Sequence, residues 1–109
     1  MKKYHVYWTH EATIDLQEII EYISLERISV AKIIYEQIKS KCFSLYTSPE
    51  RYRIVPELNK IGFTQYREII YIPYRIIYKV TTQDIFVIAV IDGRRDFEDF
   101  IFHRLIRHK

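Results

Sequence analysis

Three strand-like runs follow one another in the second half of the chain, and the last run has no polar face. They cover residues 65–71, 74–81 and 85–91, separated by Pro73 and by a short polar turn, and they predict an antiparallel meander. In the last run both alternating sets are apolar: Ile85, Val87, Ala89 and Ile91 in one set, Phe86, Ile88 and Val90 in the other. Such a strand needs cover on both faces. We therefore expect a central strand in a sheet that helices cover.

The first half of the chain supplies helices for that purpose. Residues 3–9 alternate with the period of a strand. Thr9 is placed to cap a helix over residues 10–25, whose apolar residues recur at helical spacing. Ser29 is the expected N-cap of a second helix, which carries Cys42 on its apolar stripe and ends near residue 46 or 47. The two helices form a hairpin that needs an apolar surface, which the sheet provides.

The remaining segments complete the predicted fold. Residues 49–64 have no sustained period and predict a loop with short ordered pieces, and a last helix begins at Asp96 or the turn before it. The order is β-α-α-β-β-β-α, an α+β fold with a helical hairpin packed on a mainly antiparallel four-stranded sheet. At 109 residues, the chain is expected to form a single domain over residues 1–109.

Positive charge is concentrated in the second half of the chain. Residues 1–50 carry 6 Lys and Arg against 7 Asp and Glu, residues 51–109 carry 11 against 7, and eight of the nine arginines follow residue 50. Either an anionic partner or a solvated basic surface explains this pattern. No apolar run reaches the roughly 18 residues of a membrane helix, and the start of the chain lacks the apolar segment of a signal peptide. We therefore expect a cytoplasmic protein.

Several segments, in order and over about 90 residues, resemble the RelE/ParE superfamily of type II toxin–antitoxin toxins, and its ParE-like branch in particular. The matching segments are Trp8-Thr9-His10-Glu11-Ala12, Val55-Pro56-Glu57-Leu58, Tyr66-Arg67-Glu68, Tyr74-Arg75-Ile76-Ile77-Tyr78-Lys79-Val80 and the stretch from Val87 to Asp96. The resemblance implies a toxin that arrests growth when free and is silenced by a cognate antitoxin in a hetero-oligomer. ParE-like members act on DNA gyrase, whereas RelE-like members cleave mRNA on the ribosome.

The end of the third strand-like run favours the ParE-like branch. A His-Tyr type of ending accompanies RNase activity in the superfamily, and Gly93-Arg94-Arg95-Asp96 stands there instead. We therefore expect gyrase inhibition without turnover, with the ribosome-dependent mRNA endonuclease as the alternative. In that alternative the resemblance makes Glu57, Arg67, Arg75 and Arg95 the candidate catalytic residues.

For binding of a target or antitoxin the candidates are Arg67, Arg75, Arg94, Arg95, Phe97 and Phe100. Each arginine also has a structural alternative, since Arg75 has Glu57 or Glu68 as a possible partner, and Asp92 or Asp96 is placed to bind the Arg94-Arg95 pair. Whether Arg67 lies opposite Arg75 or opposite Tyr78 depends on the turn that joins the two strands. His103 and His108 lack the i, i+4 spacing of a helical metal site, and we expect neither a metal nor a cofactor.

Overall fold

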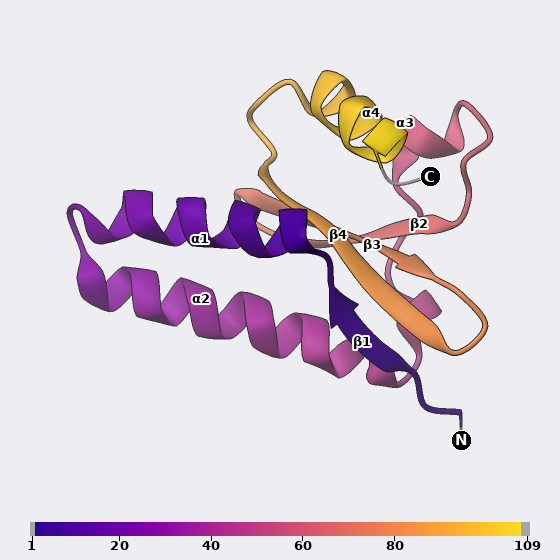
Figure 1. Ribbon diagram of the computed structural model, residues 1–109, viewed down its shortest axis with the longest axis horizontal. Helices are drawn as coiled ribbons and strands as arrows, with labels where there is room; N and C mark the ends of the chain where they lie inside the picture. Colours follow the sequence, from indigo (N-terminus) through magenta and orange to yellow (C-terminus); the bar gives the residue numbers. More distant parts are fainter. Residues whose placement is uncertain (1, 108–109) are drawn as a thin grey trace.

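The computed structural model describes residues 2–107, in the element order predicted from the sequence (Figure 1). The helices and strands are β1 (His5–Trp8), α1 (His10–Ser24), α2 (Ile28–Phe43), α3 (Pro56–Asn59), β2 (Tyr66–Tyr71), β3 (Tyr74–Val80), β4 (Asp84–Asp92) and α4 (Phe97–Arg107). Two 3-10 turns, Ser44–Tyr46 and Pro49–Arg51, lie between α2 and α3. The predicted α+β order is confirmed, and the predicted loop contains α3, which begins with a proline at its first position. None of the described helices is long and apolar enough to cross a membrane.

The sheet is four-stranded and mixed, with strand order β1-β4-β3-β2. The strands β2, β3 and β4 form the expected antiparallel meander, and β1 runs parallel to β4 along its first half, from His5 opposite Asp84 to Trp8 opposite Val87. In the β2–β3 hairpin Arg67 lies opposite Tyr78, because Ile72 and Pro73 form a two-residue turn. Of the two registers left open by the sequence, this is the one that separates Arg67 from Arg75.

A bulge in β4 changes which of its side chains share a face. Ile77 of β3 pairs with Ala89 and Tyr78 pairs with Val87, so Ile88 is an extra residue in β4. Strict alternation would place Ala89 and Ile91 with Val87, and that expectation was wrong. Beyond the bulge, Ala89 and Ile91 join the core on the other face, and Val90 joins the core beneath the helical hairpin.

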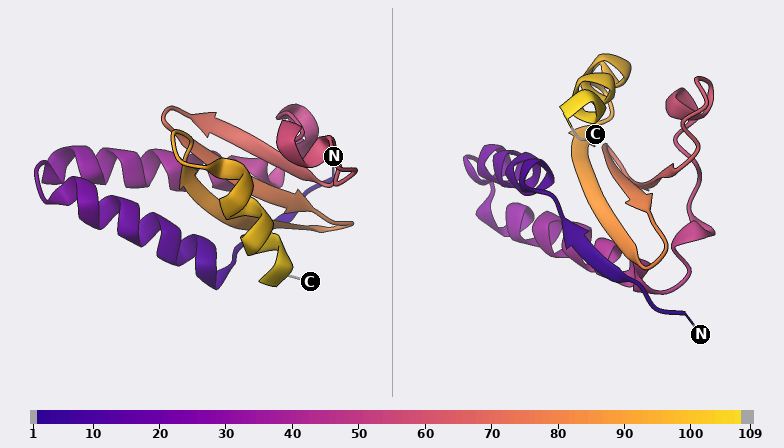
Figure 2. Two further views of the ribbon diagram at one scale, coloured as in Figure 1. Left: turned by 90° about the horizontal axis from the view of Figure 1, so that it is seen from above. Right: turned by 45° about the vertical axis from the view of Figure 1, so that its right-hand side comes forward.

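The sheet is covered on both faces, as the apolar β4 predicted. Figures 1 and 2 show the α1–α2 hairpin on one side and α3 and α4 on the other. The hairpin core includes Ala12 and Leu16 of α1 and Ile38 of α2. The core on the other face includes Leu58 of α3 and Ile101 of α4. Two apolar layers therefore share one sheet.

Of the two helix caps predicted from the sequence, one is confirmed and one is wrong. Thr9 caps α1, since its hydroxyl accepts the amide hydrogen of Ala12 at 3.1 Å. Ser29 is not the cap of α2: the helix begins at Ile28 after Arg27, whose side chain makes no capping hydrogen bond. Cys42 is fully buried, and burial raises the pKa of its thiol to about 12, as befits a packing residue.

Candidate functional site

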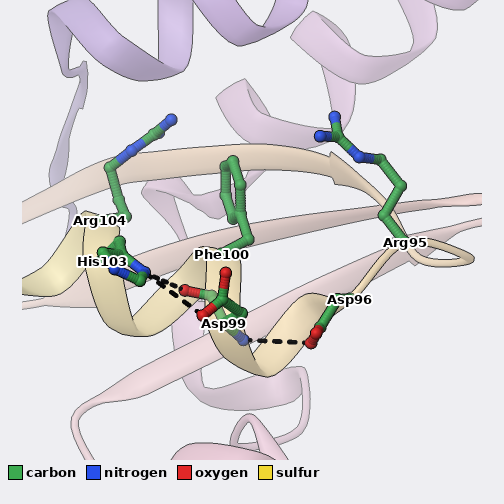
Figure 3. Close-up of a pocket in the computed structure, with 6 residues that line it drawn as sticks. All are labelled: Arg95, Asp96, Asp99, Phe100, His103 and Arg104. Atoms are coloured by element: carbon green, nitrogen blue, oxygen red, sulfur yellow. Dashed lines mark hydrogen bonds and ion pairs between the residues drawn. The ribbon is translucent and has the colours of Figure 1, made fainter.

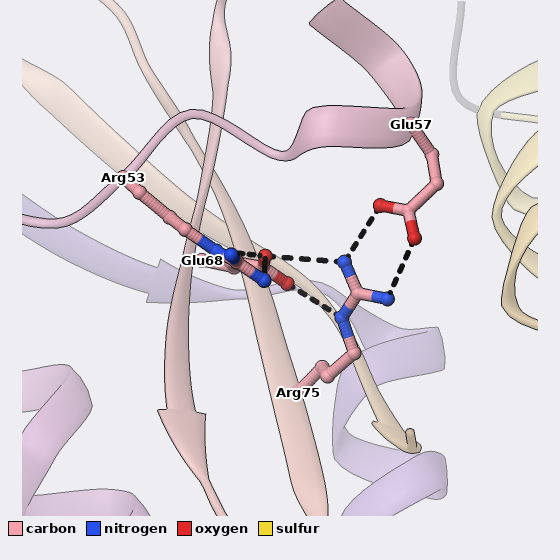
Figure 4. A network of polar contacts seen from close by, with 4 residues as sticks. All are labelled: Arg53, Glu57, Glu68 and Arg75. Atoms are coloured by element: carbon pink, nitrogen blue, oxygen red, sulfur yellow. Dashed lines mark hydrogen bonds and ion pairs between the residues drawn. The ribbon is translucent and has the colours of Figure 1, made fainter. Parts of the chain in front are cut away.

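Arg75 lies at the centre of a network of four charged side chains on the α3/α4 side of the sheet (Figure 4). Its Nε donates to Glu68 at 2.7 Å, and its two terminal nitrogens donate to the two carboxylate oxygens of Glu57 at 3.0 and 2.8 Å. Arg53 donates to the other oxygen of Glu68 at 2.7 Å. The Arg75 guanidinium also lies 3.6 Å from the ring centre of Phe97. The network thus joins β2, β3, α3 and α4.

Burial makes this network strongly coupled. Glu68 is 1% exposed, and the Arg75 side chain is 13% exposed. Burial by itself lowers the pKa of Arg75, but the hydrogen bonds with Glu57 and Glu68 outweigh burial and the pKa is raised. The bond from Arg75 in turn lowers the pKa of Glu57. Both structural partners considered for Arg75 from the sequence therefore bind it at once.

Arg67 lies on the opposite face of the sheet from Arg75. Its guanidinium donates to the backbone carbonyls of Glu50 and Tyr52 at 3.1 and 2.6 Å. These bonds fix the chain between α2 and α3 against the sheet, where the hydroxyl of buried Tyr78 also donates to the carbonyl of Pro49. The structure therefore does not bring the candidate residues Arg67 and Arg75 into one site.

In the turn after β4, Arg94 is bonded to a carboxylate and Arg95 is not. A close approach favours glycine at position 93, since a Cβ would lie 3.1 Å from the carbonyl oxygen of Pro73 and 3.2 Å from the Arg75 side chain. Asp92 binds Arg94, which lowers the pKa of Asp92 to about 2. Arg95 is exposed, and its guanidinium makes no hydrogen bond or ion pair with any described residue. Arg95 is therefore available to an anionic partner.

An ion pair that was not predicted from the sequence connects α4 with α1 and β4. The two nitrogens of Arg104 donate to the two oxygens of Asp15, both at 2.8 Å, and one of them also reaches the carbonyl of Ile88. Asp15 accepts the amide hydrogen of Val90 at 3.0 Å. The pairing of β4 with β1 ends at Val87, and beyond it these side chains bind the backbone groups on the open edge of β4. Arg104 therefore links the last helix to the first helix and to the central strand.

Phe97 and Phe100 occupy different environments on α4. Phe97 is buried beneath Arg75, whereas Phe100 is half-buried and packs against the guanidinium of Arg104, 4.8 Å from the ring centre. Figure 3 shows Phe100 between Arg95 and Arg104 in a hollow of about 450 Å³. Arg95 and Phe100 thus offer a charged and an apolar contact side by side.

A second hollow of about 500 Å³ lies at the β2–β3 turn. Its lining comprises Arg53, Ile70, Ile72, Pro73, Tyr74, Arg75, Gly93 and Arg94. Ile72 is 86% exposed, and no carboxylate is among the lining residues. We call this hollow together with Arg95, the residue that follows Arg94 in the same turn, the basic surface. Each arginine of the hollow is bonded to a carboxylate outside it, so the unpaired positive charge of the basic surface comes from Arg95. Together with the exposed side chain of Ile72, this charge suits an acidic, partly apolar protein segment.

Comparison with known proteins identifies the family of the chain. The family model described as the ParE toxin of the type II toxin–antitoxin system parDE matches residues 6–97. The chain belongs to the ParE toxin family. This match confirms the family that the sequence motifs of this ParE toxin indicated. A search of curated proteins found no match.

Solved structures agree with the fold of this ParE toxin. A chain of the chromosomal ParDE toxin–antitoxin system from P. aeruginosa matches with a TM-score of 0.67 at 17% identity, covering 83% of this chain and 96% of that one. A chain of the toxin–antitoxin complex RelBE2 from Mycobacterium tuberculosis matches with a TM-score of 0.56 at 15% identity, covering 84% and 93%. At these identities the matches support the RelE/ParE-like fold.

Proposed function

We propose that this ParE toxin arrests growth in the bacterial cytosol by binding and inhibiting DNA gyrase, and that a cognate antitoxin neutralises it. The observation that carries the proposal is the state of Arg75. All three of its donor nitrogens are bonded to Glu57 and Glu68, and the ring of Phe97 lies against its guanidinium. An arginine held in this way stabilises the fold, and a scissile phosphate would have to displace two carboxylates to reach it.

The chemistry of RNA cleavage supports the same choice. Attack by a 2′-hydroxyl needs a base near that oxygen, an acid for the leaving oxygen, and cations for the developing charge. Glu57 is the candidate for proton transfer, but its bonds from Arg75 lower its pKa and so weaken it as a base. Arg67 lies on the other face of the sheet, and Arg95 projects from the turn before α4. The four candidates for catalysis do not converge on one phosphate.

The basic surface suits the antitoxin. An acidic segment there would find the unbonded cation of Arg95 and the exposed apolar side chain of Ile72, and it would remove both from water. The chain's formal net charge of +3 favours association with an acidic partner. Membership of a family of antitoxin-controlled toxins supports such a partner.

A supercoiling assay tests the target. Purified toxin should inhibit gyrase at micromolar concentration, and the antitoxin encoded beside it should restore supercoiling when added in equimolar amount. Unimpaired supercoiling at that toxin concentration would rule out gyrase as the target.

Primer extension on translated mRNA tests the alternative, for which the fold similarity to RelBE2 is the motivation. Cuts in register with codons that disappear in Arg75→Ala would establish the endonuclease in place of gyrase inhibition. We expect the wild-type toxin to produce no such cuts, because the partners of Arg75 occupy its donors.

A further inference from the structure

A third hollow, between α3 and α4, has a different character from the basic surface. It measures about 430 Å³ and is lined by Glu57, Leu58, Ile61, Asp96, Glu98, Asp99, Ile101 and Phe102. We call it the α3–α4 hollow. Residues of both helices line it, and both helices cover the same face of the sheet (Figure 1).

The floor and walls of the α3–α4 hollow are apolar. Leu58 and Ile101 are each about 1% exposed and form part of the core beneath it. Ile61 is 53% exposed and Phe102 is 49% exposed. Two large side chains left open to water in one concave place, above a closed floor, are typical of a surface that another protein covers.

The rim of the hollow carries the opposite charge from the rest of the second half of the chain. Four carboxylates line it, and no lysine or arginine is among its lining residues. Glu57 is bonded to Arg75, and Asp96 accepts the amide hydrogen of Asp99. Glu98 is exposed and makes no hydrogen bond or ion pair with the side chains of residues 2–106. The free charge at this rim is therefore negative.

We propose that the α3–α4 hollow is the surface with which the toxin holds its target, and that its occupant is a segment of the target that carries Lys or Arg beside an apolar side chain. The inference rests on the proposed function. An enzyme that handles DNA neutralises phosphates with Lys and Arg, so it exposes basic segments. Glu98 attracts such a segment and Phe102 and Ile61 pack against its apolar side chain. The same rim repels an acidic antitoxin, which the basic surface attracts.

The two surfaces share no lining residue, but one ion pair, between Arg75 and Glu57, connects them. Arg75 lines the basic surface, and Glu57, which binds it, lines the α3–α4 hollow. Substitutions at exposed residues of one surface therefore test it without removing that shared contact. Glu98 and Phe102 serve for the hollow, and Arg95 serves for the basic surface.

The experiment compares Glu98→Lys and Phe102→Ser with Arg95→Glu, with Glu36→Lys on the exposed face of α2 as the matched charge-reversal control. We measure growth arrest, gyrase binding and affinity for the cognate antitoxin. Glu98→Lys and Phe102→Ser should each weaken gyrase binding about tenfold or more and relieve growth arrest, with antitoxin affinity unchanged. Arg95→Glu should weaken antitoxin binding about tenfold and leave gyrase binding unchanged. Circular dichroism and an unchanged thermal unfolding midpoint verify that the hollow variants are folded.

The outcomes separate this inference from the proposed function. Full growth arrest by the folded Glu98→Lys and Phe102→Ser variants overturns the inference. Loss of antitoxin affinity together with target binding in these folded variants also overturns it, since one surface then serves both partners. If wild-type toxin does not bind gyrase but Glu98→Lys and Phe102→Ser abolish growth arrest, the gyrase assignment falls and the hollow remains the target surface.

Discussion

At the scale of single residues, Glu68 is the charged side chain that is buried among the residues whose exposure the structure describes. It accepts hydrogen bonds from both Arg53 and Arg75. Arg75 keeps its bonds with Glu57 when Glu68 is removed, but its Nε loses its acceptor. Glu68→Ala should therefore lower the free energy of unfolding by about 1–3 kcal/mol. Chemical denaturation measures this change.

The matched control is Arg53→Ala at the outer end of the same network. The Arg53 side chain is 57% exposed, and water compensates such a group, so the expected loss is about 0–1 kcal/mol. Equal losses for the two variants would show that burial of Glu68 does not govern the network.

A second prediction at this scale concerns the pKa of Asp92. The bonds from Arg94 lower that pKa from 3.8 to about 2 in the folded protein. The stabilisation from this pair is therefore present above about pH 4 and is lost as the pH falls toward 2. In Arg94→Ala the pKa should rise toward its ordinary value. An NMR titration of the Asp92 carboxyl carbon measures it.

Arg95→Ala is the control for that titration. Arg95 affects Asp92 only through charge and donates no side-chain hydrogen bond to it. The pKa of Asp92 should rise less in Arg95→Ala than in Arg94→Ala. A larger rise in Arg95→Ala would contradict the assignment of the shift to the Arg94 bonds.

Sequence reasoning was more successful for contacts close in sequence than for distant ones. The Thr9 cap and the binding of the Arg94 region by Asp92 involve residues two or three positions apart. The pair Asp15 and Arg104 is separated by 89 positions, and no local pattern indicates it. The partners of Arg75 were named as alternatives, but only the assembled sheet and α3 show that it binds both.

At the scale of elements, the Asp15–Arg104 pair contributes to holding α4, together with the buried side chains of Phe97 and Ile101. Removing Asp15 takes away the carboxylate that accepts hydrogen bonds from both Arg104 and the Val90 amide, and leaves Arg104 with the carbonyl of Ile88. A double-mutant cycle with Asp15→Ala and Arg104→Ala should give a coupling free energy of about 1–3 kcal/mol. The Val90 amide should exchange its hydrogen faster in Asp15→Ala than in wild type. Additive effects of the two substitutions would contradict this role.

Sequence reasoning gave neither the short helix α3 nor the first residue of α2. The helix α3 has only four residues, too few for a periodic pattern. The α2 N-terminus was misplaced because a serine one residue inside the helix has the composition of a cap without its position. The long helices and the four strands were predicted because their apolar spacing is sustained over several residues.

At the scale of the whole molecule, β4 belongs to both apolar cores. Its residues Ile85 and Val87 pack under the helical hairpin, and Ile91 packs under α3 and α4. Neither layer has a sheet of its own, so the two should unfold together, as the predicted single domain requires. Trp8 fluorescence reports on the hairpin layer and far-UV circular dichroism on all elements. Their urea transitions should coincide, and two separate midpoints would contradict a single cooperative unit.

The bulge at Ile88 has a consequence for how distant relatives are aligned. A relative with a regular strand here has one residue fewer between the positions of Val87 and Ala89. The correct alignment then needs a gap inside β4, where gaps are usually placed only in loops. Without that gap, every position on one side of Ile88 is compared with a residue that faces the opposite layer. The strand pairing, and not the sequence, shows where such a gap belongs, and its place decides which residues are matched to Ala89, Val90 and Ile91.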